Sequence, residues 1–143
     1  MNNLHKPPMK DEIIIYQAEE VSTRIEVRIY NETVWLSMEE ISFLFGRDRS
    51  VVNRHINNIF KERELNKEEV CAFFAHTTQH GAIKGKTQRN KLEYFNLDVI
   101  LTVGYRVNSK RGAQLRVWAT AVLRDPILKG YPVNRAARRP TYQ

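Results

Sequence analysis

The chain has 143 residues, of which 42% are hydrophobic and 27% charged, and its formal net charge is +7. This composition is typical of one globular domain and excludes an intrinsically disordered chain. One cysteine allows no internal disulfide, and no apolar run reaches the ~18 residues that span a bilayer. We expect a cytoplasmic protein with no signal peptide and no membrane partner. The basic charge favours an anionic partner, either nucleic acid or an acidic protein.

The first predicted elements are strands. Residues 1–11 are expected to form a flexible leader, and a short apolar run follows at residues 13–16. Residues 24–30 alternate apolar and polar side chains, which is typical of a half-buried strand. A second strand over residues 34–36, after a turn signal at Asn31 and Glu32, predicts a hairpin over residues 24–36.

Two helices are predicted next, joined by a glycine. Ser37 and Glu40 have the spacing of a capping box, and Gly46 suits the end of that first helix. Asp48 is expected to cap a second helix over residues 49–64. That helix has an apolar stripe facing the first helix and an opposite polar stripe. The apolar stripe comprises Val52, Ile56, Ile59 and Phe60, and the polar stripe comprises Ser50, Asn53, Arg54 and Asn57.

The C-terminal half predicts a small hairpin and two helices. The predicted strands cover residues 70–78 and 91–95, separated by a flexible loop at 79–89, and the helices cover 97–105 and 112–123, with Asn96 and Ser109 as capping residues. We therefore predict an α+β fold with a winged helix-turn-helix-like part at 12–66, a hairpin and two helices packed on it at 67–131, and a basic tail at 132–143.

Two short helices with Asn, Arg and Ser on the exposed face of the second are typical of a helix-turn-helix. Arg can bind guanine and Asn can bind adenine in the major groove, so residues 49–60 are the predicted recognition helix for double-stranded DNA. The alternative is an ordinary solvated helix pair, but three asparagines are poor helix formers. The predicted DNA-binding residues are Arg47, Arg49, Ser50, Asn53, Arg54, Asn57, Arg106, Lys110 and Arg111.

The last three of these residues belong to a second basic cluster, at residues 105–112. This cluster contains no acid and joins the two C-terminal helices. It is interpreted either as a phosphate contact or as a solvated loop whose Tyr105 packs in the core. The two interpretations stay open.

No enzymatic or metal site is expected. Cys71 with His55, His76 and His80 lacks the second cysteine pair of a typical zinc site, and no nucleophile or phosphate-loop motif occurs. We predict no catalytic residue, no metal and no cofactor.

Several long runs resemble the RhuM family. They include Trp35-Leu36 and Asp48-Arg49-Ser50 within residues 23–60, and they continue over residues 70–77, 94–98, 100–112, 118–120 and 129–131. The resemblance implies a bacterial protein that is encoded on mobile elements and is labelled as virulence-associated. It also implies DNA binding and transcription regulation, which are commonly inferred for this family. The tail from Val133 onward departs from the family, as in a truncated end.

The sequence therefore predicts a regulatory DNA-binding protein, with a homodimer possible because two-fold symmetric proteins match palindromic sites. The alternative is a module that binds an acidic protein, such as a phage antirepressor-like or toxin–antitoxin component, without catalytic activity.

Overall fold

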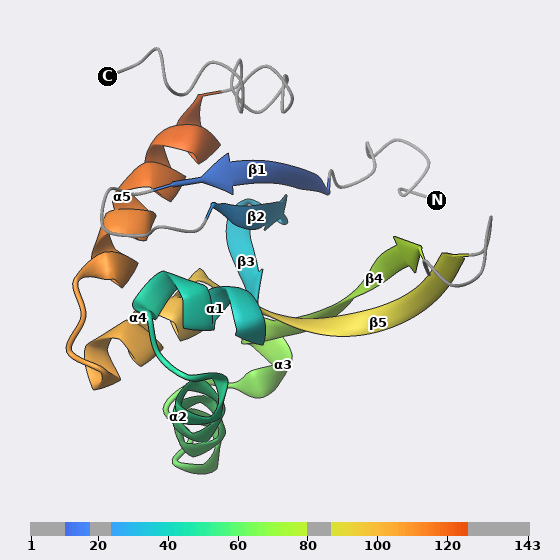
Figure 1. Cartoon of the computed structure of the whole chain (residues 1–143). Helices are drawn as coiled ribbons and strands as arrows, with labels where there is room; N and C mark the ends of the chain where they lie inside the picture. Colours follow the sequence, from blue (N-terminus) through green and yellow to red (C-terminus); the bar gives the residue numbers. More distant parts are fainter. Residues whose placement is uncertain (1–10, 18–23, 80–86, 126–143) are drawn as a thin grey trace, which may run out of the picture.

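A computed structural model describes residues 11–17, 24–79 and 87–125, and the side chains of residues 76–79 and 87–90 are not described. The fold is α+β, as predicted, with a five-stranded antiparallel sheet and five helices among the described residues (Figure 1). The predicted leader, except for Asp11, and the tail at 132–143 lie outside the described residues. The elements in chain order are β1 (Glu12–Tyr16), β2 (Ile25–Tyr30), β3 (Thr33–Ser37), α1 (Met38–Phe45), α2 (Arg49–Lys61), α3 (Lys67–Val70), β4 (Cys71–Gln79), β5 (Thr87–Asn96), α4 (Leu97–Arg106) and α5 (Arg111–Arg124).

The strands of both halves of the chain form one sheet in the order β1-β2-β3-β5-β4. The predicted hairpin at 24–36 forms β2 and β3, and β3 then pairs with β5, with Leu36 opposite Phe95. Both side chains are buried on the same face, and this shared burial favours the pairing. The hairpin therefore lies inside the sheet and does not flank α2, so the predicted winged order is not confirmed.

Several predicted boundaries need correction. The apolar run at 13–16 is β1, an edge strand paired with β2. The predicted loop at 79–89 is too long, because β4 extends to Gln79 and β5 begins opposite it at Thr87. The first residues of β5 lack the apolar alternation that predicts a strand. The short helix α3 was not predicted, and Asn66 caps it by accepting a hydrogen bond from Glu68 N. Helix α2 ends at Lys61 and not at 64, because Arg63 has a positive φ of 60°.

The main core lies between the sheet and the helices. Ile25, Val27 and Ile29 of β2 are buried with the inner faces of α1, α2, α4 and α5, because alternate residues of a strand point to one face. Helix α2 packs on α1 and α4. The opposite face of the sheet carries a second cluster, in which the rings of Tyr30, Trp35, Phe74 and Tyr94 meet edge to face.

Candidate nucleic-acid interface

The connection between α1 and α2 is built from local signals that the sequence contains. Ser37 Oγ accepts a hydrogen bond from Glu40 N at 3.3 Å, and Glu40 Oε1 accepts one from Ser37 N at 2.9 Å, so the predicted capping box is confirmed. Gly46 ends α1 in the left-handed region, with φ 62°, where a side chain is disfavoured. Asp48 then caps α2 by accepting a hydrogen bond from Ser50 N at 2.9 Å. The two helices are therefore joined by residues 46–48 alone.

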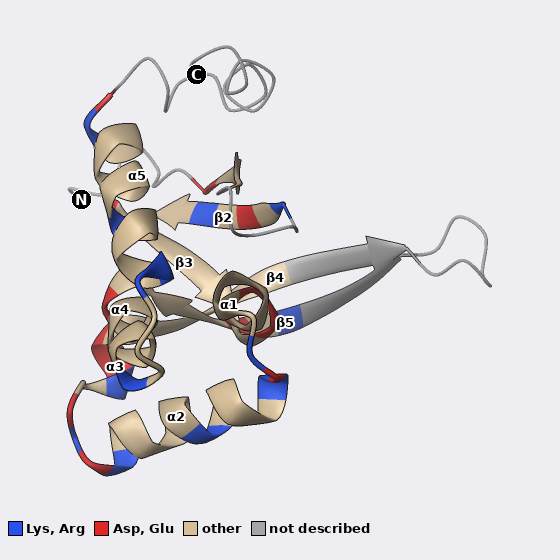
Figure 2. Cartoon of the chain, turned by 60° about the vertical axis from the view of Figure 1, so that its left-hand side comes forward, with Lys and Arg blue, Asp and Glu red and all other residues tan. Residues whose placement is uncertain are grey.

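Helix α2 has the two faces that the sequence predicts. Val52, Ile56 and Ile59 are at most 2% exposed and pack into the core. The opposite stripe, formed by Ser50, Asn53, Arg54 and Asn57, is exposed. In Figure 2 the helix lies apart from the sheet, with basic residues along its length, and its sequence contains no acidic residue. This face can therefore approach an anionic surface.

The N-terminus of α2 carries a negative charge. The Asp48 carboxylate accepts hydrogen bonds from both Ser50 N and Ser50 Oγ, and these bonds lower the pKa of Asp48. Backbone N–H groups at a helix start can hold a phosphate, but here the carboxylate occupies that place. The Ser50 hydroxyl is thus committed to Asp48, while Arg49 is exposed beside it.

Three of the predicted DNA-binding arginines form contacts within the fold. Arg47 Nη2 donates to Val107 O at 3.0 Å, and Arg111 Nη1 donates to Leu44 O at 3.2 Å. Arg106 Nη2 donates to Glu62 and Glu64, at 2.7 Å to each carboxylate. These contacts join both ends of α2 and the end of α1 to the segment between α4 and α5.

Tyr105 does not pack in the core, because its side chain is 86% exposed. This part of the solvated-loop interpretation of residues 105–112 is therefore wrong. Lys110 is also exposed. Ser109 was expected to cap α5; Lys110 is the capping residue, and Ser109 Oγ accepts a hydrogen bond from Arg111 N.

His55 lies at the border between the two faces of α2. Its pKa is lowered by partial burial and by the neighbouring charges of Arg54, Arg106 and Arg47, so the imidazole is neutral near pH 7. Burial raises the pKa of the Cys71 thiol to about 12, so the thiol stays protonated. Within the described segments, no group of three or more His, Cys, Asp and Glu side chains is placed to hold a metal ion.

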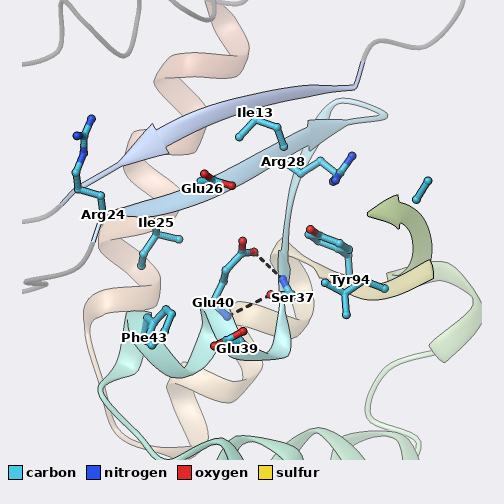
Figure 3. Close-up of a pocket in the computed structure, with 12 residues that line it drawn as sticks. Ile13, Arg24, Ile25, Glu26, Arg28, Ser37, Glu39, Glu40, Phe43 and Tyr94 are labelled. Carbon is cyan, nitrogen blue, oxygen red and sulfur yellow. Dashed lines mark hydrogen bonds between the residues drawn. The ribbon is translucent and has the colours of Figure 1, made fainter. Parts of the chain in front are cut away.

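A groove of about 440 Å³ on the other face of the sheet was not predicted. Figure 3 shows Glu40 pointing from α1 toward Glu26 on β2, with Arg28 and Tyr94 nearby. The Arg28 guanidinium lies 4.6 Å from the centre of the Phe74 ring and also pairs with Asp11. The polar side of the alternating β2 sequence was the available signal, but it indicates only a surface. The mixed charges of the groove select no single ligand.

Glu40 predicts a pH dependence of stability. Burial raises its pKa to about 7 from 4.5, so the folded state binds the proton more tightly than the unfolded state. This contribution is fully present below pH 4.5 and is lost as the pH rises toward 7. Glu40→Gln keeps the capping box but cannot ionise. We expect the variant to gain stability relative to the wild type by up to about 3 kcal/mol between pH 4.5 and 8.

Urea denaturation of both proteins across this pH range measures the effect. The difference between the two proteins isolates Glu40, because all other titrating groups are shared. Stability curves that stay parallel from pH 4.5 to 8 would contradict the raised pKa.

The described part of the chain is thus an α+β protein that exposes a basic and polar helix beside its sheet. Comparison with known families gives one match: residues 69–139 match the model of the Virulence protein RhuM family. The match confirms, over this segment, the RhuM-family resemblance of the sequence. The match runs to residue 139, so the expectation that the family likeness ends before the tail is wrong. No curated protein and no solved structure matches the chain.

The family match begins after α2, so it covers α4, α5 and the β4–β5 hairpin but not the predicted recognition helix. The assignment to the family and the case for α2 therefore depend on different parts of the chain. Among the described helices, none is long and apolar enough to cross a membrane.

Proposed function

We propose that this protein is a cytoplasmic, non-enzymatic DNA-binding protein of the RhuM type that regulates genes of a mobile element and places α2 in the major groove of double-stranded DNA. The observation that carries the proposal is the exposed, acid-free stripe on α2, held away from the sheet by α1 and α4. A helix of this kind fits the major groove, and a net charge of +7 attracts the phosphate backbone.

The contacts divide the predicted residues by role. Asn53, Arg54 and Asn57 would read base edges, because their side chains are exposed along one stripe. Arg49 and Lys110 would contact phosphates. Ser50 would act through the Asp48 cap. Arg47, Arg106 and Arg111 would act as positioning residues that hold α2 on the α4–α5 segment.

Fluorescence anisotropy of a random duplex tests the proposal. We expect wild-type affinity to fall steeply as salt rises, because bound cations are released from the duplex. Arg54→Ala/Asn57→Ala should weaken binding at low salt by about threefold, because on a random duplex the main loss is the charge of Arg54. The matched control is Arg116→Ala/Gln114→Ala, which makes the same charge change on the exposed side of α5. Absence of wild-type binding at low salt, or equal losses in both double variants, would reject the proposal.

A protein-interaction module is the second candidate, favoured by the negative charge that Asp48 places at the start of α2 and by the neutralisation of Arg106 by Glu62 and Glu64. In this case the remaining basic residues would bind an acidic protein. Retention of host proteins on the immobilised chain after nuclease treatment, lost in Arg54→Ala/Asn57→Ala but not in the control, would favour it.

A further inference from the structure

Strand β4 is an edge strand of the sheet, and it is long for an edge strand. It has nine residues, and all nine pair with β5 in unbroken register, from Cys71 opposite Phe95 to Gln79 opposite Thr87. In Figure 1 the outer part of the β4–β5 ribbon extends away from the helices. A two-stranded ribbon is marginally stable in water, and further strands stabilise it. The ribbon would therefore gain from an additional strand along β4.

The sequence of β4 lacks the features that usually protect an edge strand. Natural edges are short or carry charges, prolines or bulges that prevent pairing with another chain. The nine residues Cys-Ala-Phe-Phe-Ala-His-Thr-Thr-Gln include no Lys, Arg, Asp, Glu or Pro, and the register contains no bulge. The side chain of Phe73 on this strand is 63% exposed. By contrast, the opposite edge strand β1 has five residues and begins with Glu12.

We propose that β4 pairs antiparallel with β4 of a second copy of this chain, about a two-fold axis at Ala75, and that the two sheets form one continuous sheet of ten strands. Ala75 is the middle residue of β4 and is exposed, so an axis there pairs all nine residues. Phe73 then lies in register with residue 77 of the second copy. A two-fold interface of this kind closes at a dimer.

The charge of β4, unlike that of the whole chain, is compatible with a second copy at this edge. Two molecules with a net charge of +7 repel each other over most of their surface. Strand β4 carries no formal charge, so two copies can meet there without opposing like charges directly across the interface. The inference does not depend on DNA binding, because α2 is not part of β4.

Sedimentation of the full chain tests the proposal at concentrations up to about 100 μM, where an association of micromolar Kd is populated. We expect a wild-type dimer. Phe73→Lys/Thr77→Lys should be monomeric, because it places like charges opposite each other across the axis. Phe73→Lys/Thr77→Glu should remain a dimer, because it places opposite charges there. Circular dichroism reports whether each variant is folded, and the second variant remains decisive where the first fails to fold.

A wild-type monomer over this range overturns the proposal. So does a dimer that persists in Phe73→Lys/Thr77→Lys, because another surface would then hold the copies together. Assemblies larger than a dimer also overturn it, since a two-fold pairing of β4 leaves no second β4 edge free.

Cross-linking tests the position of the axis. In a Cys71→Ser background, Ala75→Cys places two thiols directly opposite each other, at a separation that a disulfide spans. We expect a covalent dimer after mild oxidation. The matched control Phe73→Cys, also in the Cys71→Ser background, places its thiols about 13 Å apart, four residues along the strand, and should not cross-link. A higher yield from Phe73→Cys than from Ala75→Cys overturns the axis at Ala75.

Discussion

Replacing Phe45 by alanine is expected to lower the free energy of unfolding by about 3–5 kcal/mol, as for other buried phenylalanines. Phe45 is the last residue of α1 and is 4% exposed. Its ring lies against Gly104 of α4 and Gly112 of α5, where a Cβ atom would come within 3.0 and 3.4 Å of the ring. The ring therefore fills a space that two glycines leave open, and its loss creates a cavity where three helices meet.

Urea denaturation measures this loss, and two further variants define its cause. Phe43→Ala is the matched control, because Phe43 is on the same helix but is 46% exposed. We expect this variant to change the free energy of unfolding by less than about 1 kcal/mol.

Gly104→Ala tests the contact between α4 and the Phe45 ring. It should destabilise the wild type, because the added methyl group meets this ring. In the Phe45→Ala background the same change should stabilise, because alanine is the better helix former by about 1 kcal/mol. An effect of Gly104→Ala that has the same sign in both backgrounds contradicts the contact.

Arg54→Ala is expected to weaken binding to a preferred duplex by about 10- to 100-fold, the effect of losing one bidentate base contact. The duplex would be selected with the wild-type protein from a random pool. Binding to a scrambled duplex should weaken much less, so that the variant loses discrimination between sequences. The side chain of Arg54 is exposed, so the fold should be unaffected, which thermal unfolding checks.

Lys110→Ala is the matched control for Arg54→Ala. Lys110 is also an exposed cation, but it lies between α4 and α5. As a phosphate contact it should weaken binding to both duplexes alike and lower the salt dependence. If Arg54→Ala also weakens both duplexes equally, Arg54 contacts only the backbone and α2 does not read sequence through it.

The sequence predicts those parts of the fold that depend on residues close to one another along the chain. The capping residue Ser37, the left-handed Gly46 and the apolar stripe of α2 act within one or two helical turns, so α1 and α2 could be predicted closely. The pairing of β3 with β5 joins residues about sixty positions apart, and no local pattern indicates it. A hairpin could therefore be predicted while its place inside the larger sheet could not.

The candidate site shows the same division. The exposure of Asn53, Arg54 and Asn57 follows from helical periodicity. The partners of Arg106 do not, because Glu62 and Glu64 reach it only when α2 packs on α4. A cluster that looks wholly basic along the chain is therefore partly neutralised in space. The groove around Glu40 and Glu26 likewise arises from the meeting of α1 with the sheet.

The pairing of β3 with β5 also bears on which pieces of the chain can fold alone. A piece ending near residue 66 would contain α2 but would lack β5, and a piece starting near residue 69 would lack β3. Each piece would expose apolar side chains, such as Leu36 or Phe95, that are at most 2% exposed when the strands are together. Neither piece is therefore expected to fold by itself, so the α2 region and the segment that matches the family model are parts of one folding unit.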